Sequence, residues 1–300
     1  DQSTSMNTVL PGSTQTRWQA VTTAIINFLN TSQSTALSVG IQYFGQPAVG
    51  GTPGASTCDI AAYSTADVEL GSLSDPNQVT ALTQSIQRHM PSTFTPTGPA
   101  LAGAIAHAKT WASSHPDHPT IVVLATDGFP SECDPMDLTT IATTIVGPAA
   151  SAPADSAANA RIRTFVIAAG NDSGLGGLQA ISSAGGTGSP FVVMDNANSG
   201  AQITAALVQI SHTNLACTYV IPVPDAGLDP SLVNVRLTAS GQAPVLLDLL
   251  KPGQLCTAAG GFFYDSPTAP KHISLCPATC DSLVTGSLEI VVGCPTRGPQ

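Results

Sequence analysis

The chain has 300 residues, of which 42% are hydrophobic and only 9% charged, and its formal net charge is −10. This length exceeds the roughly 100–200 residues of a typical domain, so it predicts one large domain and a smaller module. Nucleic acids and anionic membranes are bound through clustered Lys and Arg, so the acidic balance argues against both as partners. No apolar run approaches the roughly 20 residues of a membrane-spanning helix, and no transmembrane segment is predicted.

Helical and strand patterns alternate along the first 214 residues. Asp75 and Pro76 mark a helix start, as N-cap and first-turn residue. The helices are expected at 16–29, 76–88, 99–114, 136–147, 175–184 and 200–213. The strands are expected at 37–44, 68–73, 120–126, 162–169 and 190–194, with 120–126 and 162–169 as buried parallel strands. This alternation predicts an α/β fold, a doubly wound and mostly parallel sheet with helices on both faces.

The pattern changes after residue 216, where short β-like runs are separated by Gly, Pro and Asp turns. The sequence therefore predicts two domains, 1–214 and 216–300, the second a small β-rich module stapled by disulfides. Five of the seven cysteines lie in this module: Cys217, Cys256, Cys276, Cys280 and Cys294.

The cysteines also indicate the compartment. A low-charge chain with this many cysteines is typical of disulfide-bonded, exported proteins. No CxxC pair and no Cys/His set with zinc-finger spacing occurs, so structural zinc is not predicted. Because seven is odd, one thiol is free or has its partner outside this sequence.

Three oxygen-rich segments are expected to meet at one edge of the sheet. The chain opens D-Q-S-T-S, with Asp1, Ser3 and Ser5 at alternate positions, and T-F-T-P-T-G covers 93–98 at the start of a helix. Asp127 comes directly after the strand 120–126, and ligands of open α/β sheets bind at the carboxyl ends of strands. Hydroxyl and carboxylate oxygens suit a hard cation such as Mg²⁺, which takes six oxygens and usually keeps several waters.

These residues resemble the von Willebrand factor A family, which includes integrin inserted domains, complement components and many bacterial surface proteins. The family pattern is D-x-S-x-S, then Thr in T-x-T-G, then Asp in T-D-G, and the resemblance covers about residues 1–214. It implies a metal-ion-dependent adhesion site made of five residues: Asp1, Ser3, Ser5, Thr95 and Asp127. Ser3 and Ser5 would be direct ligands, Thr95 direct or water-mediated, and the two Asp residues would neutralise charge and hold waters.

The resemblance also implies a function. The expected cofactor is Mg²⁺, with Mn²⁺ or Ca²⁺ as alternatives, and the expected partner is a protein that presents Asp or Glu to the metal. The layout resembles bacterial exported proteins, which implies a secreted, periplasmic or cell-surface location. The family's first, central strand would precede Asp1 and is absent from this sequence; an export signal, a lipid anchor or a further domain could stand there.

Alternatives to this reading remain open at each position. Asp1, Ser3 and Ser5 could belong to a Ser/Thr-rich tail, Thr97 could replace Thr95 as ligand, and Thr95 could be a helix cap. Asp127 could be a turn residue. His115 and His118 are expected in a solvated loop rather than a metal site, and Phe129 at the rim.

The sequence also leaves alternatives for the whole protein. One is a metal-dependent hydrolase acting on cell-envelope material; no persuasive general base is found, so an enzyme is not predicted. The other is a structural surface protein with a vestigial metal site.

Two disulfide predictions follow from the expected topology. The loop with Cys58 should lie at the same sheet edge as the loop after Asp127, so Cys58 and Cys133 are expected to pair. In the β module, strands Val220–Val223 and Ile290–Val292 are expected to bring Cys217 and Cys294 together, although connectivity is not derivable from sequence.

Overall fold

The computed structural model describes residues 1–31, 37–50, 52–115, 120–151, 161–170, 175–215, 218–222, 228–238, 243–251, 260–266, 268–276, 279 and 287–293. The chain divides into two compact units, Asp1–Val208 and Gln209–Gln300. The predicted domain bounds, 1–214 and 216–300, stay a prediction. In the described part of the chain, no helix is long and apolar enough to cross a membrane.

The first unit is built on parallel strands, as predicted. Strands β3 (Ile121–Thr126), β4 (Arg163–Ala169) and β5 (Phe191–Val193) form a parallel sheet in that order. A separate antiparallel pair joins β1 (Ser38–Ile41) to β2 (Val68–Ser72). Strand β1 is shorter than the predicted 37–44, and within it the register with β2 shifts between Val39 and Ile41.

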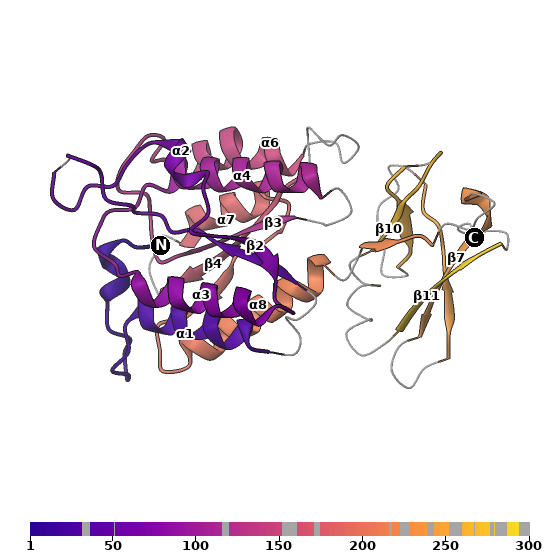
Figure 1. The fold of residues 1–300 in the computed structure, drawn as a ribbon, viewed down its shortest axis with the longest axis horizontal. Helices are drawn as coiled ribbons and strands as arrows, with labels where there is room; N and C mark the ends of the chain where they lie inside the picture. Colours follow the sequence, from indigo (N-terminus) through magenta and orange to yellow (C-terminus); the bar gives the residue numbers. More distant parts are fainter. Residues whose placement is uncertain are drawn as a thin grey trace. The chain divides into compact units, whose positions relative to one another are not determined.

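Helices lie on both sides of these strands (Figure 1), with α1, α3 and α8 on one side and α4, α6 and α7 on the other. Their bounds are α1 Arg17–Leu29, α2 Ile60–Tyr63, α3 Pro76–Arg88, α4 Thr97–Ser114, α5 Leu138–Ile141, α6 Gly147–Ala150, α7 Leu175–Ala184 and α8 Ser199–Leu215. A 3-10 turn, Thr4–Asn7, follows the first residues.

Local chemistry explains where these helices begin. The Thr16 side chain accepts from the Gln19 amide and the Gln19 side chain accepts from the Thr16 amide, a capping box that starts α1. Asp75 caps α3 as predicted. The predicted helix 136–147 is instead a run of α5, a π-helical segment Ala142–Val146 and α6. The π segment precedes Pro148, which has no amide hydrogen to continue an α-helical ladder.

The core of the first unit has two parts. One includes Leu101 of α4, Leu124 of β3 and Val166 of β4, and the other packs Leu29 of α1 and Leu82 of α3 against the β1–β2 pair. A cavity of about 150 Å³ is lined by residues of β1, β3, α1 and α4 together with Asp1.

The prediction that 120–126 is a fully buried strand is wrong for part of β3. Val123 is 38% exposed. Among the described strands, β3 is hydrogen-bonded to β4 alone. Its other edge borders the cavity, so side chains there lack a neighbouring strand to cover them.

The second unit consists of short strands, as predicted. One sheet has the order β6-β10-β9, with bounds Thr218–Val220, His272–Leu275 and Phe262–Tyr264, and the other has the order β11-β7-β8, with bounds Ser287–Val292, Val233–Thr238 and Val245–Leu247. A 3-10 turn, Pro230–Leu232, leads into β7. The core of the second unit contains Val233, Val235, Phe262 and Ile273.

The expected pairing of the strands near Cys217 and Cys294 is wrong for the described residues. Strand β6 pairs with β10, and β11 pairs with β7, because the module splits its strands between two sheets. Cys217, Cys256, Cys280 and Cys294 lie outside the described residues. Cys276 is disulfide-bonded.

The Cys58–Cys133 disulfide is confirmed, with a Cα–Cα distance of 5.5 Å. It joins the loop before α2 to the loop that follows β3. The backbone amide of Ser56 also donates to the Glu132 carboxylate at 2.7 Å, so two contacts hold these loops together. The bridge spans 75 residues, and the loss of chain entropy in the unfolded state corresponds to about 4 kcal/mol of stabilisation.

Candidate metal site

The first residues of the chain are held between two other segments. The Gln2 amide donates to the Phe44 carbonyl, and Ser3 bridges Thr93 in a parallel arrangement. The Asp1 carboxylate is fixed from both sides: Oδ1 accepts from the Ser3 amide at 2.8 Å, and Oδ2 accepts from the Thr126 hydroxyl at 2.6 Å. Asp1 is therefore oriented by its own turn and by the end of β3.

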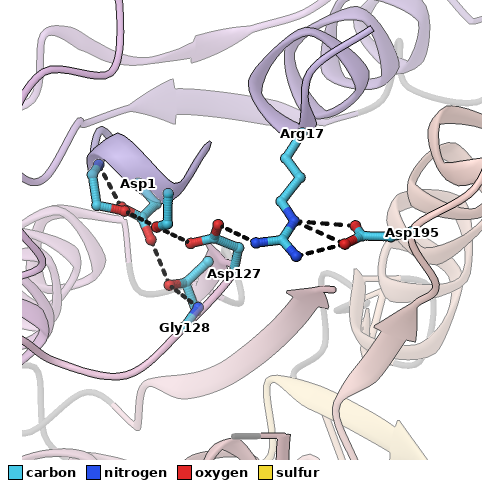
Figure 2. A network of polar contacts seen from close by, with 8 residues as sticks. Asp1, Arg17, Asp127, Gly128 and Asp195 are labelled. Atoms are coloured by element: carbon cyan, nitrogen blue, oxygen red, sulfur yellow. Dashed lines mark hydrogen bonds and ion pairs between the residues drawn. The ribbon is translucent and has the colours of Figure 1, made fainter. Parts of the chain in front are cut away.

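Hydroxyl groups connect Asp1's segment to Asp127. The Ser3 and Ser5 hydroxyl oxygens lie 2.9 Å apart, and the Ser5 hydroxyl donates to Oδ1 of Asp127 at 2.8 Å. Figure 2 shows this chain of contacts running from Asp1 to Asp127. The structure thus brings together four of the five predicted site residues, Asp1, Ser3, Ser5 and Asp127.

Thr95 lies on the segment between Thr93, which pairs with Ser3, and α4. Its amide donates to the Ser131 hydroxyl at 3.0 Å, and its carbonyl accepts from the Ser131 amide at 3.1 Å. Ser131 follows Asp127 by four residues, so the loops that carry Thr95 and Asp127 are joined. The alternative that Thr95 caps the helix is wrong, because the N-cap of α4 is Pro96 and no side chain caps it.

The competing threonine, Thr97, begins α4 and is fully buried. Within the described part of the chain, its hydroxyl oxygen has no hydrogen-bond partner. A hydroxyl in that condition costs free energy unless something outside the described residues satisfies it.

Two charged residues of the site were not predicted from sequence, Arg17 and Asp195. Arg17 is the first residue of α1, and its Nη1 donates to Oδ2 of Asp127 at 2.8 Å. Its Nε donates to Oδ1 and Oδ2 of Asp195 at 3.1 and 3.0 Å, and Nη2 donates to the same Oδ2 at 2.5 Å. Figure 2 shows the guanidinium between the two carboxylates.

A signal for both residues existed in the sequence. Asp195 follows the strand 191–193 as Asp127 follows β3, so the same strand-end rule applies to it. Arg17 is one of only nine basic residues and occupies the first turn of a helix, where acidic residues are favoured.

Burial and charge shape the ionisation of these groups. The hydrogen bond from Arg17 to Asp195, together with that to Asp127, raises the pKa of Arg17 above its already high range despite burial. The backbone nitrogen of Asp1 lies 3.4 Å from the Ala125 carbonyl of β3.

The donor set fits a hard cation. The oxygens gathered here come from two serine hydroxyls and two carboxylates, and the described ranges hold no group of three or more His, Cys, Asp or Glu residues that could hold a metal ion. Mg²⁺ prefers oxygens of this kind and needs only one or two carboxylates, with waters completing its shell. The residues Asp1, Ser3, Ser5 and Asp127 therefore suit Mg²⁺ and do not suit Zn²⁺.

The surroundings of the site carry exposed aromatic side chains. Phe94 is 45% and Phe129 is 54% exposed, and each is within two residues of a predicted metal-binding residue. Phe129 is thus exposed two residues after Asp127, and its rim position stays a prediction. His115 stacks on Trp111 at the end of α4, whereas His118 lies outside the described residues.

Comparison with known proteins assigns the family. No curated protein is similar enough to match the chain. A solved structure, the von Willebrand factor type A protein from Catenulispora acidiphila, is 13% identical, with a TM-score of 0.42. That match covers 94% of this chain and 56% of the other protein's length. Residues 1–206 match the family described as von Willebrand factor type A domain, and the chain therefore belongs to that family.

Proposed function

We propose that this protein is a binding module that uses a divalent cation, held by Asp1, Ser3, Ser5, Thr95 and Asp127, to engage a carboxylate of a protein partner. Domains of this family generally mediate contacts between proteins. The observation that carries the proposal is the hydrogen-bonded series from Asp1 through Ser3 and Ser5 to Asp127, which gathers oxygens from both ends of a 127-residue stretch.

The charge of the site favours an acidic partner. Mg²⁺ bound there would offer an open position to a carboxylate oxygen. Arg17 already neutralises part of the Asp127 charge, so the site's own residues compensate a divalent cation incompletely. The exposed Phe94 and Phe129 give the partner apolar surface to contact around the acidic group.

We also propose that a central strand, expected ahead of Asp1, lies in the cavity between β1 and β3. Two observations support this position. The cavity is lined by both strands, and the Asp1 amino group is directed at the Ala125 carbonyl, so a chain continued backwards from Asp1 would run beside β3.

We further propose that the protein is exported, of the bacterial type, and acts at the cell surface, in the periplasm or outside the cell. The Cys58–Cys133 bridge and the disulfide of Cys276 support this location, because disulfides persist in oxidising compartments.

Titration calorimetry with Mg²⁺ and Mn²⁺ tests the metal site. The native protein is expected to bind, and Asp127→Ala is expected to abolish binding. Lys109→Gln is the control, since Lys109 is twelve residues beyond the start of α4 and about 18 Å along it. An Asp127→Ala variant with native affinity would contradict the assignment.

Capture from a cell-envelope extract then tests the partner. The partner should be retained in Mg²⁺ and released by EDTA, and the Asp127→Ala variant should retain nothing in either condition. A partner that stays bound in EDTA would contradict metal-dependent binding and would place the binding surface outside this site.

A further inference from the structure

Arg17 occupies a position that helix physics disfavours. It is the first residue of α1, where the helix dipole presents its positive end and a cation costs about 0.3–1 kcal/mol. The residue is only 8% exposed, so its charge is also removed from water. Both costs require compensation, and the capping box of Thr16 and Gln19 starts the helix without help from Arg17.

The compensation comes from two buried carboxylates on different segments. The Asp127 side chain is completely buried and that of Asp195 is 7% exposed. Asp195 receives bonds from Nε and Nη2, whereas Asp127 receives one bond from Nη1. Counted by themselves, Arg17, Asp127 and Asp195 carry one net negative charge.

The fold also leaves room for the guanidinium. Gly170, which directly follows β4, has a φ of +137°, and a Cβ there would lie 3.3 Å from Nη2 of Arg17. A side chain at this position would crowd the group and strain the backbone. The segments bearing residues 17, 127, 170 and 195 thus all accommodate one charged side chain.

Within Asp127 the two carboxylate oxygens have different partners. Oδ1 accepts from Ser5, on the side of the predicted metal-binding residues, and Oδ2 accepts from Arg17. Arg17 therefore fixes the plane of the carboxylate and shares its charge from the side opposite to Ser5's segment.

We propose that Arg17, balanced by Asp195, is a positioning residue that sets the cation affinity of the site: it orients Asp127 and withdraws negative charge from it. This inference rests on the proposed metal site. Arg17 weakens cation binding by its charge, and Asp195 strengthens it. Because Arg17 takes up part of the negative charge of Asp127, a cation bound there is less neutralised. It therefore attracts an incoming carboxylate more strongly.

A double-mutant cycle on the full chain, with Mn²⁺ alone as probe, tests the proposal. Free Mn²⁺ is measured by electron paramagnetic resonance. Coulomb's law gives about a tenfold effect in affinity for one unit charge several ångströms from a divalent ion. Arg17→Gln is expected to bind Mn²⁺ about tenfold more tightly, and Asp195→Asn about tenfold more weakly. The double variant restores the charge balance and should return to within about threefold of the native affinity.

The cycle separates charge balance from a merely structural role. If Arg17 and Asp195 only support the fold, all three variants bind more weakly, and that result overturns the proposal. If Arg17→Gln does not fold, as judged by circular dichroism, the double variant decides, and a tenfold or greater loss in it overturns the proposal. Lys109→Gln makes the same charge change away from the site and should leave affinity unchanged.

The failure of the proposed function gives a different result. A native protein and variants that all fail to bind Mn²⁺ would overturn the metal site and this inference together. A native protein that binds while the cycle shows uniform weakening overturns the role of Arg17 alone.

Discussion

Thr95 and Thr97 are two residues apart and face different environments. Thr95 joins the loop after Asp127 through Ser131, whereas the Thr97 hydroxyl is fully buried without a partner in the described ranges. Thr95→Val is expected to weaken Mg²⁺ binding by about 10- to 100-fold, the loss seen when groups around a metal are removed. Calorimetry measures this affinity.

Thr97→Val is the matched control, because it makes the same change in shape and polarity. It removes a hydroxyl without a partner in the described ranges, so the affinity for Mg²⁺ should stay unchanged and the free energy of unfolding should not fall and should rise if that hydroxyl is unsatisfied. Loss of metal binding in Thr97→Val, with native affinity in Thr95→Val, would make Thr97 the ligand in place of Thr95.

The site residues that were predicted from sequence are marked by local patterns, whereas Arg17 is placed by tertiary packing. Asp1, Ser3 and Ser5 are close in the chain, and Asp127 follows an apolar strand, so local pattern was sufficient to group them. Arg17 enters the site by the length and direction of its side chain from α1. The first-turn position of Arg17 marks it as unusual, but no local pattern encodes its reach to Asp127, which depends on tertiary packing and on the space left at Gly170.

At the scale of elements, the sheet of the first unit has two facing edges beside a cavity. In the described strands, β1 bonds to β2 and β3 bonds to β4, and neither bonds to the other. Attaching an extended segment with alternating Val and Thr residues ahead of Asp1 is expected to raise the free energy of unfolding by at least about 2 kcal/mol. Each apolar side chain buried in the cavity contributes about 1.5–3 kcal/mol.

Hydrogen exchange locates the effect of this segment. The amides of β1 and β3 should exchange more slowly, because they gain hydrogen-bond partners or cover. A Gly/Ser segment of equal length is the control, since it has no side chains to fill the cavity. Equal stabilisation by the two segments would exclude this placement of the strand.

Most helices and strands were predictable from periodicity and caps, and the deviations have physical causes. Helix α3 begins at Pro76 because Asp75 caps it, as the sequence indicates. The π segment before Pro148 and the exposure of Val123 were not predictable. The first depends on how one turn meets a proline inside a helix, and the second depends on which strands neighbour β3 in space.

At the scale of the molecule, the second unit combines a small apolar core with disulfide bonding. Its core surrounds Phe262 and Ile273, and Cys276 is disulfide-bonded. Removing a native disulfide from a small exported domain costs about 2–5 kcal/mol. Reduction is therefore expected to make residues 209–300 sensitive to limited proteolysis, followed by mass spectrometry of the fragments.

The control for this experiment is a variant with Ser at both positions 58 and 133. It already lacks the bridge of the first unit, so cleavage that appears only after reduction belongs to the second unit. Continued resistance of 209–300 when fully reduced would show that the apolar core alone maintains the unit.

Helix α8 runs from Ser199 to Leu215, and the boundary between the two units falls within it, at Val208–Gln209. Tension applied to the chain beyond the boundary would be carried along this helix to the turn at its start. There the Ser199 hydroxyl donates to the Met194 and Asn196 carbonyls, and Asp195 forms an ion pair with Arg17. The Arg17–Asp195 ion pair therefore lies on the path of contacts that leads from the end of the first unit to Asp127.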